Sequence, residues 1–178
     1  MTVKSIKLRT ACDAVLVPQG VPVLLESGTE VNVVQSLGGN VTVNYNGNLF
    51  QIAARDAHAL GEEYSRPVLS LDSDATAEDW VWACLRTCYD PEIPINIVDL
   101  GLVYDCRLSE LVSGGTRVDV RMTLTAPGCG MGAVIAEEIK QRLESLEQIT
   151  VANIEIVFDP PWCVERMSEA AKLELGLW

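Results

Sequence analysis

Apolar and polar positions alternate along residues 1–71 in short runs that tight turns separate. Five runs have strand length and are rich in β-branched residues: AVLV, VPVLLE, EVNVVQSL, VTVNY and LFQIAA. The last two runs are joined through Asn46-Gly47, a dipeptide typical of type I′ hairpin turns, in which both central residues need a positive φ. Several short strands in so little chain are typical of a barrel or curled sheet. Residues 1–71 are therefore predicted to form a small, all-β, barrel-like domain.

Residues 72–178 have a different rhythm, because apolar positions recur at helical spacing as well as at strand spacing. Asp74 or Thr76 is expected to cap a first helix that runs to about Tyr89. Strands follow in LVYDCRL, RVDVRMTLT and VANIEIVF, a second helix lies between the last two, and a third helix covers 164–175. The predicted order is α-β-β-α-β-α. The predicted fold class of the whole chain is therefore α+β, with an α/β sandwich after the β domain.

Two of these elements carry cysteines whose pattern favours the protein core. Cys84 and Cys88 are four residues apart and share one face of the first helix with apolar neighbours. In the first strand, strict alternation puts Val103 on one face, together with Asp105 and Arg107. The opposite face is predicted to point inward and to carry Leu102, Tyr104, Cys106 and Leu108. Cys106 is therefore predicted to be inert.

The order of the elements brings three irregular loops to one end of the predicted sheet. The second and third strands are joined through a helix, so they are predicted to be parallel, with a right-handed crossover. The first strand is predicted to be antiparallel to the second. The loop before the first strand and the loops after the other two therefore meet; they are DPEIP…VDLG, PGCG and DPPWC. Loops at the carboxyl ends of strands are a common place for a binding site.

Composition and charge narrow the classes of function. The 178 residues are 48% hydrophobic and include 25 acidic and 13 basic side chains, which gives a formal net charge of -12. Such a surface repels phosphate and anionic lipid, so nucleic-acid and membrane binding are not expected. No apolar run approaches the ~20 residues of a membrane-spanning helix. The chain also does not open with a signal-peptide pattern, and a cytoplasmic protein is expected.

The six cysteines are expected to be free thiols or metal ligands, because disulfides are rare in a reducing compartment. The sequence has no CxxC pair, and its single histidine is His58. A structural zinc site and a thioredoxin-type exchange are therefore poorly supported.

Cys129 has the pattern of a reactive thiol. It follows Pro127 and Gly128, lies between two glycines that leave a side chain accessible, and precedes the second predicted helix. The N–H groups and the dipole at a helix N-terminus stabilise a thiolate. No histidine in the same half of the chain can act as a protease base, so ligation of a soft metal such as iron remains. Cys163 is either a second ligand or a small residue after Trp162, and a homodimer would double the number of thiolates.

Three segments resemble one known family. DPEIPINIVDLGLVY, TLTAPGCGMG and VFDPPWCVERMSEAAKLELG resemble the small iron–sulfur-assembly domain of the SufT family, and residues 16–61 resemble the extra β domain of SufT. The resemblance implies an iron–sulfur-assembly-type α/β sandwich. It also implies an accessory factor in iron–sulfur protein maturation rather than an enzyme. In the family the cysteine of the PGC motif is functionally important. Cys129 is therefore expected to be a transient ligand of iron or an iron–sulfur cluster, or a docking thiol for a client.

The resemblance further implies a loop pocket and partners. Asp90, Glu92 and Pro94 match the first loop motif of the family, and Asp159, Pro160, Pro161 and Trp162 match the third. With these, the predicted loop pocket also includes Asp99, Pro127 and Gly128. Cys163 departs from the family pattern, so its role is not inherited. The expected partners are the iron–sulfur assembly machinery and apo-client proteins, and an ATPase would act in trans because the chain has no GxxxxGK[ST] pattern.

Two other classes of function remain open. A thiol-dependent transferase or redox enzyme would use Cys129 as the nucleophile, with Asp90, Glu92 or Asp99 as acid–base groups. A pure adaptor without metal would bind partners through its acidic surface and the C-terminal LELGLW. In that segment Trp178 would either anchor a partner or pack against the domain.

Overall fold

The computed structural model describes residues 4–64, 69–128 and 130–177. Cys129 and Trp178, two residues singled out from the sequence, lie outside these ranges. The chain divides into two compact units, residues 1–68 and 69–178, where the sequence places the boundary after residue 71.

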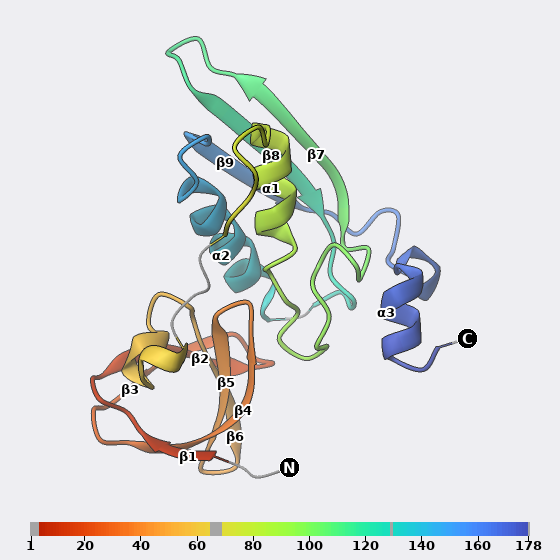
Figure 1. Ribbon diagram of the computed structural model, residues 1–178. Helices are drawn as coiled ribbons and strands as arrows, with labels where there is room; N and C mark the ends of the chain where they lie inside the picture. Colours follow the sequence, from red (N-terminus) through yellow and green to blue (C-terminus); the bar gives the residue numbers. More distant parts are fainter. Residues whose placement is uncertain (1–3, 65–68, 129, 178) are drawn as a thin grey trace. The chain divides into compact units, whose positions relative to one another are not determined.

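In its described residues the N-terminal unit has a single antiparallel sheet of six strands (Figure 1). Its strands are β1 (Lys4–Lys7), β2 (Cys12–Val17), β3 (Val21–Leu25), β4 (Glu30–Leu37), β5 (Asn40–Tyr45) and β6 (Asn48–Ile52). They are hydrogen-bonded in the order β1-β4-β5-β6-β2-β3, so the sheet ends at β1 and β3 and is curled rather than closed. The short 3-10 helices Ala57–Ala59 and Glu62–Tyr64 follow. The predicted small all-β domain is confirmed; of the barrel and the curled sheet that the pattern allowed, it is the curled sheet, with one strand more than the pattern shows.

Turn chemistry and alternation explain this sheet. Asn46 and Gly47 have φ values of 50° and 81°, as a type I′ turn between β5 and β6 requires. Val41 and Val43 on β5 face Ile52 and Phe50 on β6, and these four side chains belong to the buried core of the unit. The sixth strand, β1, was missed because KSIK is short and mostly polar.

The C-terminal unit contains three α-helices, three strands and one 3-10 helix within its described residues. They are α1 (Ala77–Leu85), β7 (Val103–Glu110), β8 (Thr116–Met122), α2 (Gly132–Glu144), β9 (Val151–Ile156), the 3-10 helix η3 (Val164–Arg166) and α3 (Glu169–Glu174). A capping box starts α1: the Thr76 hydroxyl accepts from the Asp79 N–H, and the Asp79 carboxylate accepts from the Thr76 N–H. The helix ends at Leu85, four residues before the predicted end. Cys84 and Cys88 are buried, as predicted.

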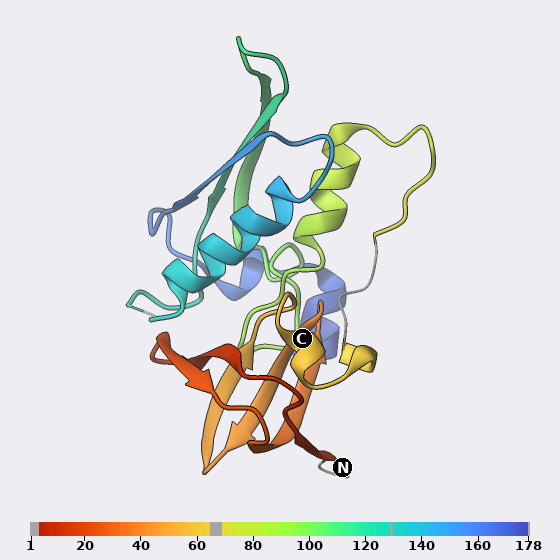
Figure 2. The same ribbon diagram turned by 90° about the vertical axis from the view of Figure 1, so that its left-hand side faces the viewer.

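The three strands form one mixed sheet in the order β7-β8-β9. The β7–β8 pair is antiparallel and the β8–β9 pair is parallel, as the connections predict. Helices α1 and α2 lie on the same face of this sheet (Figure 2), and the buried core between these layers includes Val118, Val120 and Met122 of β8. None of the helices in the described ranges is long and apolar enough to cross a membrane.

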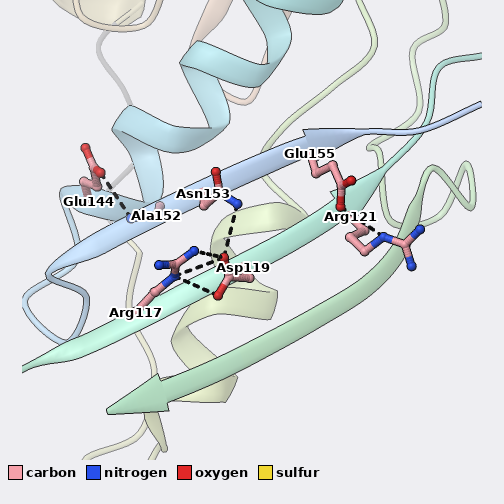
Figure 3. Close-up of polar contacts among 7 residues, drawn as sticks. All are labelled: Arg117, Asp119, Arg121, Glu144, Ala152, Asn153 and Glu155. Atoms are coloured by element: carbon pink, nitrogen blue, oxygen red, sulfur yellow. Dashed lines mark hydrogen bonds and ion pairs between the residues drawn. The ribbon is translucent and has the colours of Figure 1, made fainter. Parts of the chain in front are cut away.

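The other face of the sheet carries paired charges (Figure 3). Arg117 binds Asp119 with a shortest distance of 2.7 Å, and Arg121 binds Glu155 on β9 at 3.1 Å. Exposed ion pairs of this kind contribute about 0–1 kcal/mol each. One buried face and one solvated face make this unit a two-layer α/β sandwich.

A β-bulge in β7 changes which residues face the core. Val103 pairs with Met122 and Asp105 pairs with Arg121, so Tyr104 is an extra residue without a partner on β8. The prediction that Tyr104 shares the inward face and that Val103 faces outward is therefore wrong. Cys106 lies opposite the buried Val120 and is half-buried. Burial raises the pKa of its thiol to about 11, and Glu78 and Asp105 add to that rise.

The predicted final helix over 164–175 is also wrong, because the segment is split into two parts. Val164–Arg166 forms the 3-10 helix η3, Met167 and Ser168 are extended, and α3 begins at Glu169. Ser168 accepts from the Ala171 N–H as the N-cap of α3, while its own N–H donates to the Asp99 carbonyl at 2.8 Å. This tertiary bond holds Ser168 outside a helix.

Candidate functional site

The first loop, between α1 and β7, is held by two of its own side chains. The Asp90 carboxylate accepts from the N–H groups of Glu92 and Ile93, both at 2.9 Å. Asn96 accepts from the Val98 and Asp99 N–H groups at 3.1 and 2.9 Å, and its amide donates to the Asp99 carboxylate at 2.6 Å. Such side-chain turns satisfy backbone donors that lack a helix or strand partner. Asp90 and Asp99, two predicted pocket residues, thus shape the loop.

Asp90 is a buried carboxyl group, with only 6% of its surface exposed. Burial raises the pKa of this carboxyl above its usual range. The two backbone donors, from Glu92 and Ile93, oppose that rise because they favour the carboxylate. The charged form of Asp90 is therefore less favourable in the folded protein than in the unfolded chain.

Replacing Asp90 by asparagine is expected to raise stability at pH 7. An amide oxygen can still accept both backbone bonds, but it carries no charge to bury. A carboxyl whose pKa is raised on folding begins to lower stability as pH rises above its unfolded-state pKa, about 3.9, and the loss is complete above the folded-state pKa. The gain should therefore disappear near pH 3, where the carboxyl is protonated in both states. Urea unfolding curves at the two pH values measure the effect. A variant less stable than wild type at pH 7 would show that the charge itself is needed for folding.

The third loop, which follows β9, is attached directly to the first. The Trp162 indole N–H donates to the Leu100 carbonyl at 2.7 Å, and the Tyr104 hydroxyl donates to the Pro160 carbonyl at 2.9 Å. Gly101, at φ 71°, lies so close to Arg166 that a side chain there would overlap the Arg166 carbonyl oxygen. These contacts bring the first and third loops together, as predicted.

The second loop starts at the same end of the sheet (Figure 1). At this end the Thr123 N–H donates to the Leu102 carbonyl and the Val157 N–H donates to the Met122 carbonyl, both at 2.8 Å. These bonds continue the β7–β8 and β8–β9 pairings beyond the strands. Pro127 and Gly128 are exposed, and Gly128 has a φ of 82° with open space where a side chain would be. The flanks of Cys129 are thus uncovered.

Cys163 is an exposed free thiol of the third loop. The pKa of the neighbouring Glu165 carboxyl is lowered, first by a bond from its own N–H and then by a bond from the Cys163 thiol. Within the described residues, no three His, Cys, Asp or Glu side chains form a group that could hold a metal ion.

The remaining predicted residues lie on the outside of this loop cluster. Glu92, Pro94, Asp159 and Pro160 are exposed. Sequence reasoning missed Gly101, Tyr104 and Arg166, which join the loops. Only Gly101 has a signal in the sequence, because a glycine directly before a strand is typical of a positive φ or a close backbone approach.

The C-terminal unit is thus a small α/β sandwich with three irregular loops at one end of its sheet. This class of domain is also found in known proteins to which the chain is similar. Residues 78–156 match the family described as "Iron-sulfur cluster assembly protein". The chain is 45% identical over 101 residues to a Porphyromonas gingivalis protein named "Fe-S protein maturation auxiliary factor", covering 57% of this chain and 91% of the relative. It is 42% identical over 88 residues to "Fe-S protein maturation auxiliary factor SufT" of Staphylococcus aureus, covering 49% and 96%.

A solved structure agrees with these relatives. A "Domain of Unknown Function DUF59" from Bacillus anthracis is 34% identical, covers 57% of this chain and 93% of its own, and superposes with a TM-score of 0.50. The chain belongs to the iron–sulfur cluster assembly protein family. The family match begins at residue 78, so the resemblance of residues 16–61 to the β domain of SufT stays a prediction.

Proposed function

We propose that this chain is an auxiliary factor in the maturation of iron–sulfur proteins and acts through Cys129. The observation that carries the proposal is family membership together with the loop cluster. Relatives that match over nearly their whole length are named as maturation factors. In this chain the first and third loops are fastened together at the sheet end where the Cys129 loop begins.

The surroundings of Cys129 support a role as an accessible thiolate. Its neighbours Gly128 and Gly130 are exposed, and α2 begins at Gly132. Met131, the N-cap of α2, provides no side-chain acceptor for the first N–H groups of the helix. Uncapped N–H groups and the positive end of the helix dipole favour a nearby anion.

The cargo in this proposal is iron or an iron–sulfur cluster, held transiently. Thiolates are the ligands that such cargo prefers. Cys129 is the principal ligand and the exposed Cys163 is the second. An apo-client, a component of the assembly machinery or a second copy of this chain provides the others, and an ATPase in trans provides any nucleotide hydrolysis. In this role the chain hands over cargo and does not turn over a small substrate.

Anaerobic reconstitution with iron and sulfide tests the ligand role. Absorption and Mössbauer spectra are expected to show thiolate-bound iron in the wild type, a strong loss in Cys129→Ser and a partial loss in Cys163→Ser. Equal iron uptake by wild type and Cys129→Ser would reject Cys129 as a ligand. A client that is captured equally well by iron-free wild type would favour an adaptor.

Exposed leucines near the C-terminus support the adaptor as a second candidate function. Leu173, Leu175 and Leu177 are 57%, 37% and 40% exposed. Contiguous apolar patches at a surface often mark a contact with another protein, and these three leucines lie within five residues of one another in the chain. The test compares client capture by the full chain and by a chain without residues 173–178. If the shortened chain loses capture but still takes up iron through Cys129, this segment is the docking site.

A further inference from the structure

Tyr104 is placed toward the third loop by the bulge in β7. As the extra residue, it has no partner on β8 and does not continue the inward face of the strand. Its hydroxyl instead reaches the Pro160 carbonyl, 56 residues later in the chain, at 2.9 Å. Bulges near functional sites commonly redirect one side chain in this way.

The same side chain makes a second contact with the third loop. The Arg166 guanidinium carbon lies 4.3 Å from the centre of the Tyr104 ring, within the range of a cation–π interaction. Pro160 comes before Cys163 in the chain and Arg166 comes after it. Tyr104 therefore holds the loop on both sides of Cys163, through its hydroxyl on one side and its ring on the other.

Bonds to the first loop enclose the same stretch of chain. Trp162, directly before Cys163, is attached to the Leu100 carbonyl, and Ser168 is attached to the Asp99 carbonyl. Residues 160–168 are thus attached at two places, to Tyr104 and to residues 99–100. The segment can move only if the contacts at both places break.

We propose that Tyr104 is a positioning residue of the maturation site. It fixes residues 160–166 against the start of β7, next to the first loop, and so sets the position of Cys163 at the end of the sheet where the loop that contains Cys129 begins. This role rests on the proposed function, because it concerns the same loop cluster. Tyr104 does not touch the cargo; it acts through the loop that it holds.

Two conservative variants test the role. Tyr104→Phe keeps the ring for Arg166 but removes the donor to Pro160. Arg166→Lys keeps the positive charge but loses the planar group that lies over the ring. Tyr45→Phe, in the N-terminal unit, is the matched control for loss of a tyrosine hydroxyl.

Hydrogen exchange followed by NMR measures how firmly the loop is held. The Ser168 amide and the Trp162 indole N–H are expected to exchange about fivefold faster in Tyr104→Phe, the factor that one ordinary hydrogen bond contributes. A similar rise is expected in Arg166→Lys, and no change in Tyr45→Phe. Exchange of core amides such as that of Val120, which reports global unfolding, is expected to stay within twofold of wild type.

The functional readout is the activity of an iron–sulfur enzyme in cells that carry each variant in place of the wild-type gene. Tyr104→Phe and Arg166→Lys are expected to lower that activity at unchanged protein level, and Tyr45→Phe is not. Unchanged loop exchange in both loop variants would overturn the inference. A loosened loop with full maturation activity would also overturn it, while the proposed function would stand if Cys129→Ser is inactive in the same cells. Full activity of Cys129→Ser would reject the proposed function itself.

Discussion

Serine in place of Cys129 is expected to reduce the activity of iron–sulfur enzymes in cells by about tenfold or more, the typical effect of losing a group that supports a metal site. A serine hydroxyl does not ionise near neutral pH and is a poor ligand for soft metals. The variant should nevertheless fold, because the flanking Gly128 and Gly130 are exposed and surface substitutions usually change stability by less than about 0.5 kcal/mol. The measurement is enzyme activity in cells carrying the variant under high demand for clusters.

The matched control is Cys106→Ser, the same exchange at a half-buried thiol on β7. It is expected to cost about 1 kcal/mol of stability, because a hydroxyl replaces a thiol that is partly out of water. Maturation should remain at the wild-type level. Full activity of Cys129→Ser under high demand would contradict the proposed chemistry. An equal loss of activity in both variants would show that the loss comes from a lower amount of folded protein and not from the Cys129 thiol.

Alanine in place of Gly101 is expected to destabilise the C-terminal unit by about 3 kcal/mol. The left-handed backbone at φ 71° costs a non-glycine residue about 1 kcal/mol. The new side chain would also meet the Arg166 backbone, with its carbonyl carbon at 2.7 Å, and a carbonyl group cannot rotate away as a flexible side chain can. Relief requires Arg166 to move, which opens bonds such as that between Trp162 and Leu100, each worth about 1 kcal/mol.

Gly176→Ala separates the two causes. Gly176 has nearly the same φ, 70°, but apart from its chain neighbours no atom of the described residues lies within 4 Å of where its side chain would be. It should therefore cost only the backbone part, about 1 kcal/mol. Tryptophan fluorescence during urea unfolding measures the C-terminal unit selectively, because all four tryptophans of the chain lie between residues 80 and 178. Equal costs for the two variants would contradict a close approach between Gly101 and Arg166.

Connectivity alone was enough to predict the loop cluster. A helix between β8 and β9 dictates a parallel pair, and a short turn between β7 and β8 dictates an antiparallel one. Those two facts bring the ends of three strands together before any side chain is considered. The turn at Asn46-Gly47 and the cap at Thr76, one of the two predicted candidates, could likewise be predicted, because each depends on residues close together in sequence.

The contacts that fasten the loops were not predictable, because each depends on a partner far away in the chain. Alternation in β7 gives no sign of the bulge, which shifts the register at Tyr104 by one residue. The pattern over 164–175 is compatible with one helix, and only the bond from Ser168 to Asp99 shows why it is broken. The end of α1 at Leu85 also comes several residues before the next proline, Pro91, so that proline does not mark the end of the helix.

Thiol labelling of the native protein tests the central claim, that Cys129 is an accessible and reactive thiol, most directly. The protein is alkylated for short times near neutral pH, and the modified fraction of each cysteine is measured by mass spectrometry. Cys129 is expected to react fastest, ahead of the exposed Cys163, while the buried Cys12, Cys84 and Cys88 react only on unfolding. A Cys129 that reacts as slowly as Cys84 in the folded protein would contradict the account.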